Sequence, residues 1–146
     1  MEENQKAYDY AMFLLNLRLR TEGELREKMR SKKYESGVVD EVIKRLKDLH
    51  YIDDQRFAEV YLENLKKYKS WGFYGIKKKL MEKRLPMPLI ESVLSEGFSE
   101  EEELEVAKKF IKKYEVRSKN QDEKAKAARK LAAKGFRGSV VGKMLF

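Results

Sequence analysis

The feature that most constrains this chain is a set of apolar residues that recurs three times at one spacing. Leu25, Ile76 and Ala127 lie 51 positions apart in the sequence. Six further sets share that spacing: Met29, Leu80 and Leu131; Tyr34, Leu85 and Phe136; Val38, Leu89 and Val140; Val39, Ile90 and Val141; Val42, Val93 and Met144; Ile43, Leu94 and Leu145. Chance can supply one or two such sets, but seven at one offset predict an internal structural repeat.

The apolar spacing within each repeat is that of α-helices. Ala58, Leu62 and Leu65 follow the i, i+4, i+7 rule, and no stretch alternates as a strand would. Equivalent alanines at 11, 58 and 107 add a helix before the repeated segment. The helices are expected at about 5–19, 21–33, 38–49, 54–69, 73–84, 88–96, 100–117, 122–134 and 139–145.

Each repeat is therefore predicted to be a three-helix unit, with boundaries at 1–52, 53–98 and 99–146. A unit of this size buries only a small core, so neighbouring units are expected to stack. We predict an all-α protein: three tandem three-helix repeats that form an elongated, curved array. Such an array offers long surfaces to partners and no deep pocket.

Helix starts are marked by capping residues. Thr21 with Glu24, and Ser99 with Glu102, have the capping-box spacing. Asp53 and Asp54 precede a helix whose free N–H groups they are expected to cap, and Pro88 suits a first helical position.

Composition argues against catalysis. The chain has no cysteine and one histidine, His50, which excludes thiolate zinc sites and multi-histidine metal sites. Phosphate-loop, dinucleotide and zinc-protease motifs are absent from the sequence. We expect no enzyme activity, no cofactor and no metal.

Localisation is also suggested by the sequence. The longest uncharged stretch, residues 10–17, is too short for a membrane span. The N-terminus is acidic and has no apolar signal core. A cytoplasmic monomer with no membrane contact is expected.

Positive charge is concentrated at the C-terminal end. The net charge of the chain is +8, yet residues 108–146 hold 13 basic and 3 acidic side chains, a local net charge of +10. Such asymmetry favours a polyanion or an acidic protein surface as partner, although a solvated lysine-rich helix surface has the same composition.

Lysines also recur in the repeat, in two columns four residues apart on one helix face. We refer to these six residues as the lysine columns: Lys28, Lys79 and Lys130, and Lys32, Lys83 and Lys134. They could form a basic track along the array, widened by Lys77, Arg84, Arg129 and Arg137. Alternatively, their stems cover the edge of the core while the ammonium groups stay in water.

An aromatic segment interrupts the basic pattern at residues 70–75. Trp71 and Phe73 are flanked by lysines on both sides. Three interpretations stay open: a plug between two repeats, an anchor at a protein interface, or a stacking platform for nucleic acid bases.

Four segments resemble the RecX family of bacterial RecA regulators. Residues 17–25 are similar to its LxxRxRSxxEL stretch, and residues 51–58, YIDDQRFA, match its YIDDxRFA signature throughout. Gly75, Ile76 and Leu80 resemble its second-repeat pattern, and residues 134–141 its closing KGFxxxxI pattern. One departure is Lys83-Arg84-Leu85-Pro86, where the family has Lys-Gly-Ile.

The resemblance implies three tandem three-helix repeats and no catalytic site. It implies a protein that binds RecA filaments on single-stranded DNA and limits their extension, thereby damping recombination, DNA repair and the SOS response. Some members of the family also bind single- or double-stranded DNA weakly. The alternative class is a sequence-nonspecific DNA-binding helical protein, and a third is a purely structural scaffold.

Overall fold

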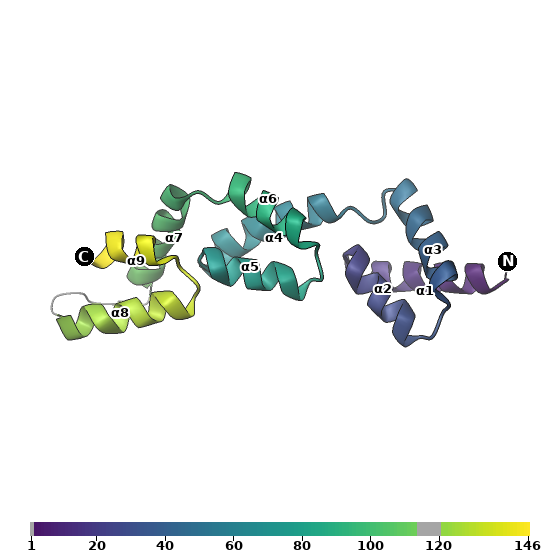
Figure 1. Cartoon of the computed structure of the whole chain (residues 1–146), viewed down its shortest axis with the longest axis horizontal. Helices are drawn as coiled ribbons and strands as arrows, with labels where there is room; N and C mark the ends of the chain where they lie inside the picture. Colours follow the sequence, from purple (N-terminus) through teal and green to yellow (C-terminus); the bar gives the residue numbers. More distant parts are fainter. Residues whose placement is uncertain (1, 114–120) are drawn as a thin grey trace.

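The protein is an elongated array of α-helices (Figure 1). The computed structural model describes residues 2–113 and 121–146. Helices are the only regular elements in these two ranges: α1 (Glu2–Leu17), α2 (Glu22–Ser31), α3 (Ser36–Asp48), α4 (Asp54–Lys69), α5 (Phe73–Glu82), α6 (Met87–Gly97), α7 (Glu100–Lys113), α8 (Gln121–Ala133) and α9 (Gly138–Leu145). The predicted all-α class and repeat architecture are confirmed. The last part of the helix predicted at 100–117, residues 114–117, lies outside the described residues.

The predicted caps form the starts of α2, α4 and α7. The Glu24 N–H donates to Thr21 Oγ1 and the Thr21 N–H donates to Glu24 Oε1, both at 3.1 Å. The same reciprocal pair joins Ser99 and Glu102. Asp53 accepts from the Arg56 N–H at 3.1 Å. The start of α6 differs slightly from expectation, because Met87 is the first helical residue and Pro86 is the N-cap.

The helices group around three separate apolar cores, and the seven repeat sets lie on the faces that build them. The first core is drawn from α1, α2, α3 and Ile52, the second from α4, α5, α6, Leu85 and Phe98, and the third from α7, α8, α9 and Phe136. Leu25, Ile76 and Ala127 are all fully buried. The proposed unit boundaries at 52/53 and 98/99 stay a prediction.

The turn after the second helix of each repeat has the same backbone conformation. Lys33, Arg84 and Gly135 occupy equivalent positions and have φ values of 68°, 59° and 83°. Arg84 therefore adopts the left-handed conformation although it is not glycine, which typically costs about 1–2 kcal/mol. The chain thus has Arg84 where the family pattern described above has glycine, but the turn keeps the same backbone conformation.

The second and third repeats are joined through the start of α5. The N–H groups of Gly72 and Tyr74 donate to the carbonyls of Lys134 and Gly135, each at 2.8 Å. A side chain on Gly72 would collide with the backbone of Phe136. Close approach of two backbones thus requires glycine at this position.

A buried carboxylate completes the same junction. Glu103 on α7 is fully buried, and its Oε2 accepts from the N–H groups of Phe73 and Arg137 at 2.9 Å each. The Arg137 Nε lies 2.5 Å from Glu103 Oε1. Val106 packs against both the second and the third core, so these two repeats also share an apolar contact.

The first and second repeats are joined by equivalent but fewer contacts. The Thr21 hydroxyl donates to the Lys83 carbonyl at 2.6 Å, and the Glu22 N–H donates to Asp54 Oδ1 at 2.9 Å. An ion pair between Arg84 and Glu27 crosses the same junction. Among the described residues, no buried or half-buried apolar side chain packs against both the first and the second core.

The repeat alignment generates a stability prediction. Leu80→Ala, at a fully buried position of α5, is expected to lower the free energy of unfolding by roughly 2–5 kcal/mol, because it leaves a cavity in the second core. Met81→Ala on the same helix, where Met81 is 49% exposed, is the matched control and should change it by less than about 1 kcal/mol. Urea unfolding followed by circular dichroism measures both. Equal effects would show that the repeat alignment does not identify the core.

Candidate partner-binding surfaces

The lysine columns lie on α2, α5 and α8 and on the turns that end them. These helices follow one another along the lower side of the array in Figure 1. Lys28 and Lys130 are exposed, as is Arg129 beside them, whereas Lys77 and Lys79 are half-buried.

The second of the two lysine columns, Lys32, Lys83 and Lys134, lies over aromatic rings. The Nζ atoms of Lys32 and Lys83 stand 5.2 Å and 5.4 Å from the ring centres of Tyr10 and Tyr61. Lys134 Nζ stands 3.8 Å from the Trp71 ring centre and also donates to the Lys69 carbonyl at 2.9 Å. A cation over a ring face is attracted by the ring quadrupole. These contacts favour the interpretation in which this column covers the edge of the core, while its role in a basic track stays a prediction.

The two arginines nearest the repeat junctions are engaged in ion pairs. Arg84 pairs with Glu27, and Arg137 pairs with the buried Glu103. The Arg137 guanidinium also lies over the Phe73 ring, 4.2 Å from its centre. Arg137 is thus held in the junction between the second and third repeats rather than on the open face of α8.

Trp71 and Phe73 lie at that same junction. Both are half-buried and pack against the second core. Phe73 stacks on Phe98 at 6.5 Å between ring centres, and Trp71 lies beneath Lys79 and Lys134. This placement favours the plug among the three interpretations, while a role as partner anchors stays a prediction.

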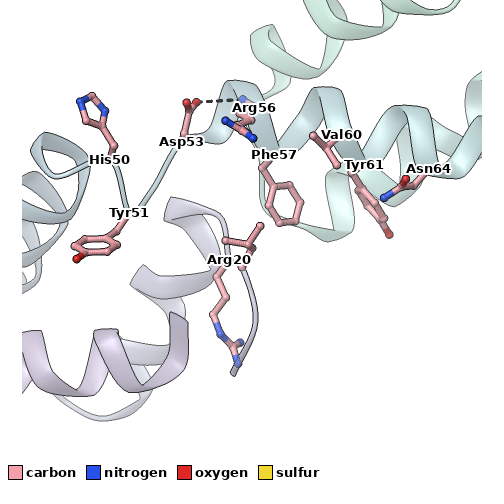
Figure 2. Close-up of a pocket in the computed structure, with 10 residues that line it drawn as sticks. Arg20, His50, Tyr51, Asp53, Arg56, Phe57, Val60, Tyr61 and Asn64 are labelled. Carbon is pink, nitrogen blue, oxygen red and sulfur yellow. Dashed lines mark hydrogen bonds between the residues drawn. The ribbon is translucent and has the colours of Figure 1, made fainter. Parts of the chain in front are cut away.

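A groove that the sequence analysis did not identify lies between the first and second repeats (Figure 2). Its volume is about 760 Å³. Residues from the α1–α2 segment, the α3–α4 segment and α4 line it: Leu19, Arg20, His50, Tyr51, Asp53, Arg56, Phe57, Val60, Tyr61 and Asn64.

The YIDDQRFA motif supplies much of this groove. Ile52 and Ala58 are buried in the cores, and the two aspartates form the cap and the junction. The motif residues left for the groove are Tyr51, Arg56 and Phe57. Phe57 also packs against the second core, whereas Tyr51 and Arg56 are exposed. An exposed aromatic residue and an exposed arginine within one short motif were the signal available in the sequence.

The carboxylates at the first junction have opposite pKa shifts. Burial raises the pKa of Asp54, and the nearby Glu22 carboxylate adds to the rise, although the Glu22 N–H opposes it. Burial also pushes the pKa of Glu22 upward, but hydrogen bonds from Lys47 and Arg26 outweigh it and hold the pKa below its ordinary value. Asp54 was expected to cap its own helix, and instead it accepts from the first turn of α2.

Two classes of site are not found in the described part of the chain. Residues 2–113 and 121–146 contain no group of three or more His, Cys, Asp or Glu side chains placed to hold a metal ion. Within the same ranges, no helix is long and apolar enough to cross a membrane.

Fold and surfaces together define a class: a tandem helical-repeat protein with basic residues along one helix series and an open groove between two repeats. Two family models match the chain, RecX first three-helix domain over residues 7–46 and RecX second three-helix domain over residues 53–94. The chain belongs to the RecX family.

Relatives extend the similarity over nearly the whole chain. Regulatory protein RecX of Geobacillus kaustophilus is 32% identical over 99% of this chain and 54% of its own length. Regulatory protein RecX of Halalkalibacterium halodurans is 31% identical over 96% and 53%. The chain thus spans about half the length of these relatives. The crystal structure of RecX from Lactobacillus salivarius matches with a TM-score of 0.84 at 26% identity, covering 97% of this chain and 94% of that one.

Asp54 generates a prediction on pH dependence. Its pKa is raised in the folded state, so its ionisation lowers stability as the pH rises from the ordinary aspartate range through the raised value. Asp54→Asn keeps an oxygen that accepts from Glu22 and removes the charge. The variant should equal or exceed wild type in free energy of unfolding at neutral pH, and its advantage should shrink as the pH falls through the raised pKa of Asp54 toward the ordinary aspartate value of about 4.

Urea unfolding of both proteins across a pH series measures this difference. Asp54→Ala, which removes the acceptor as well, should be less stable than Asp54→Asn by about 1–3 kcal/mol. An Asp54→Asn protein as unstable as Asp54→Ala at neutral pH would contradict the assigned role.

Proposed function

We propose that this protein is a RecA regulator that binds RecA filaments on single-stranded DNA and limits their extension. Membership of the RecX family is the observation that carries the proposal. An elongated array suits a partner whose binding surface is itself extended. Filament growth occurs at ends, so one bound molecule affects the addition of many subunits.

The basic surface is proposed to act as the contact with the filament. It has two potential counterparts, acidic faces of RecA and the phosphates of the bound DNA. Lys130 and Arg129 on α8 are exposed and lie in the segment of highest positive charge. Contact with more than one RecA subunit would add to the affinity through multivalency. The protein is proposed to act without catalysis or a cofactor of its own.

The proposed contact is tested by RecA ATP turnover on single-stranded DNA. Wild type should inhibit turnover at substoichiometric amounts. Arg129→Glu/Lys130→Glu should raise the half-inhibitory concentration by roughly tenfold, because two exposed charge contacts worth up to about 1 kcal/mol each are lost. Lys134 is avoided as a test site because it packs on Trp71 at the junction.

Lys28→Glu/Arg30→Glu on α2 is the matched control, because Lys28 is the repeat equivalent of Lys130 and both are exposed. It should have a smaller effect. Inhibition by wild type should weaken as salt rises, because exposed charges are screened over about 8–10 Å. If Arg129→Glu/Lys130→Glu inhibits as well as wild type at both of two salt concentrations, the basic surface is ordinary solvated surface. Tight binding of bare DNA with unchanged RecA turnover would favour the nonspecific DNA-binding alternative.

A further inference from the structure

The groove between the first and second repeats has an apolar lining that is open to water. Leu19, Val60 and Tyr51 are 73%, 51% and 48% exposed, and the half-buried rings of Phe57 and Tyr61 lie between them on α4. Figure 2 shows Tyr51 on the segment before α4 and Phe57 and Tyr61 along α4. Exposed apolar residues gathered at one hollow mark interaction sites more often than scattered ones do.

Unpaired positive charge accompanies this lining. Arg20 uses its Nε to donate to the Leu14 carbonyl at 3.2 Å, and Arg56 is exposed. Neither guanidinium has a carboxylate partner among the described residues. The one carboxylate in the groove, Asp53, accepts from the Arg56 backbone N–H. The groove therefore complements a ligand that is negative and partly apolar.

The residue types favour a peptide over a nucleic acid. Leu19 and Val60 are aliphatic and are the most exposed apolar residues of the lining. The rings of Phe57 and Tyr61 are half-buried and pack edge to face at 5.8 Å between ring centres, and Lys83 lies over Tyr61, so these rings offer little free face for a base. Exposed aliphatic surface beside arginines fits an apolar side chain that is flanked by carboxylates.

The chain's own acidic segment at the start of α7 does not provide this ligand. Glu102 pairs with Lys66, Glu103 pairs with Arg137, and Glu100 pairs with Lys143. Most carboxylates of this segment therefore already form ion pairs within the same molecule. The occupant is therefore sought in another protein.

We propose that this groove binds an acidic peptide segment of another protein, with an apolar side chain against Phe57 and Val60 and carboxylates facing Arg20 and Arg56. No lysine of the columns lines the groove, although Lys83 lies over the ring of Tyr61, which does line it. The proposal does not require that the partner be RecA. Because the groove is lined from both repeats, an occupant would add apolar contact across a junction at which, within residues 2–113 and 121–146, the two cores share no buried or half-buried apolar residue.

Fluorescence anisotropy with a labelled synthetic peptide tests the site in the absence of RecA. The probe is fluorescein-Glu-Asp-Glu-Trp-Glu-Asp-Leu-Glu, added to the full chain. One control peptide replaces the acids with Gln and Asn, and a second replaces Trp and Leu with Ser. Saturable binding of the probe, and at least about tenfold weaker binding of both controls, is expected.

Variants of the protein locate the binding. Arg56→Glu and Val60→Ser should each weaken the probe's affinity by roughly tenfold, whereas Lys44→Glu, an exposed charge reversal on α3 outside the groove, should leave it unchanged. Urea unfolding checks that all three variants are folded. Because RecA is absent, a failure here leaves the proposed RecA inhibition standing, and the reverse also holds.

Three results would overturn the proposal. The first is no saturable binding of the probe, or equal binding by the Arg56→Glu and Lys44→Glu variants. The second is displacement of the probe by oligothymidylate with an affinity that depends on Arg56, which would make nucleic acid the occupant. The third is self-association in sedimentation velocity that Val60→Asp abolishes, which would make a second copy the occupant.

Discussion

The array depends on one interaction, which occurs at both junctions between repeats. The first turn of an α-helix has N–H groups without partners inside the helix. A carboxylate from the first helix of the next repeat meets one of them: Asp54 accepts from the Glu22 N–H, and Glu103 accepts from the Phe73 N–H. This bond fixes where each repeat begins relative to the one before it, and both the groove and the lysine columns take their positions from that placement.

The two junctions share this bond but differ in the burial and ion pairing of the carboxylate. Glu103 is fully buried and pairs with Arg137, whereas Asp54 is half-buried and has a raised pKa. A buried carboxylate without a partner would be strongly destabilising, so the third repeat requires Arg137 at its junction. Arg137, which could have widened a basic track, thus contributes to the junction between the second and third repeats.

The helices and the cores could be predicted from the sequence because they depend on local spacing. Thr21, Ser99 and Asp53 were identified as caps from short motifs, and the repeat sets identified the buried faces. The contacts between repeats, and the placement of one repeat relative to the next, could not be predicted from local spacing. The role of Asp54 depends on α2 of the preceding repeat, and the groove depends on how two repeats are placed. Nothing in the local pattern distinguishes the exposed Lys130 from Lys134, which packs on Trp71.

The absence of a shared apolar residue between the first and second cores, within the described part of the chain, has a mechanical consequence. Apolar contact resists separation over its whole area, whereas hydrogen bonds and an ion pair act only at the atoms that they join. The second and third repeats are linked through Val106 as well as the Glu103 cluster, and the first repeat is held to the second by the bonds of Thr21 and Asp54 and the Arg84–Glu27 ion pair. We therefore expect the array to bend first at the junction between the first and second repeats, while the second and third repeats move together.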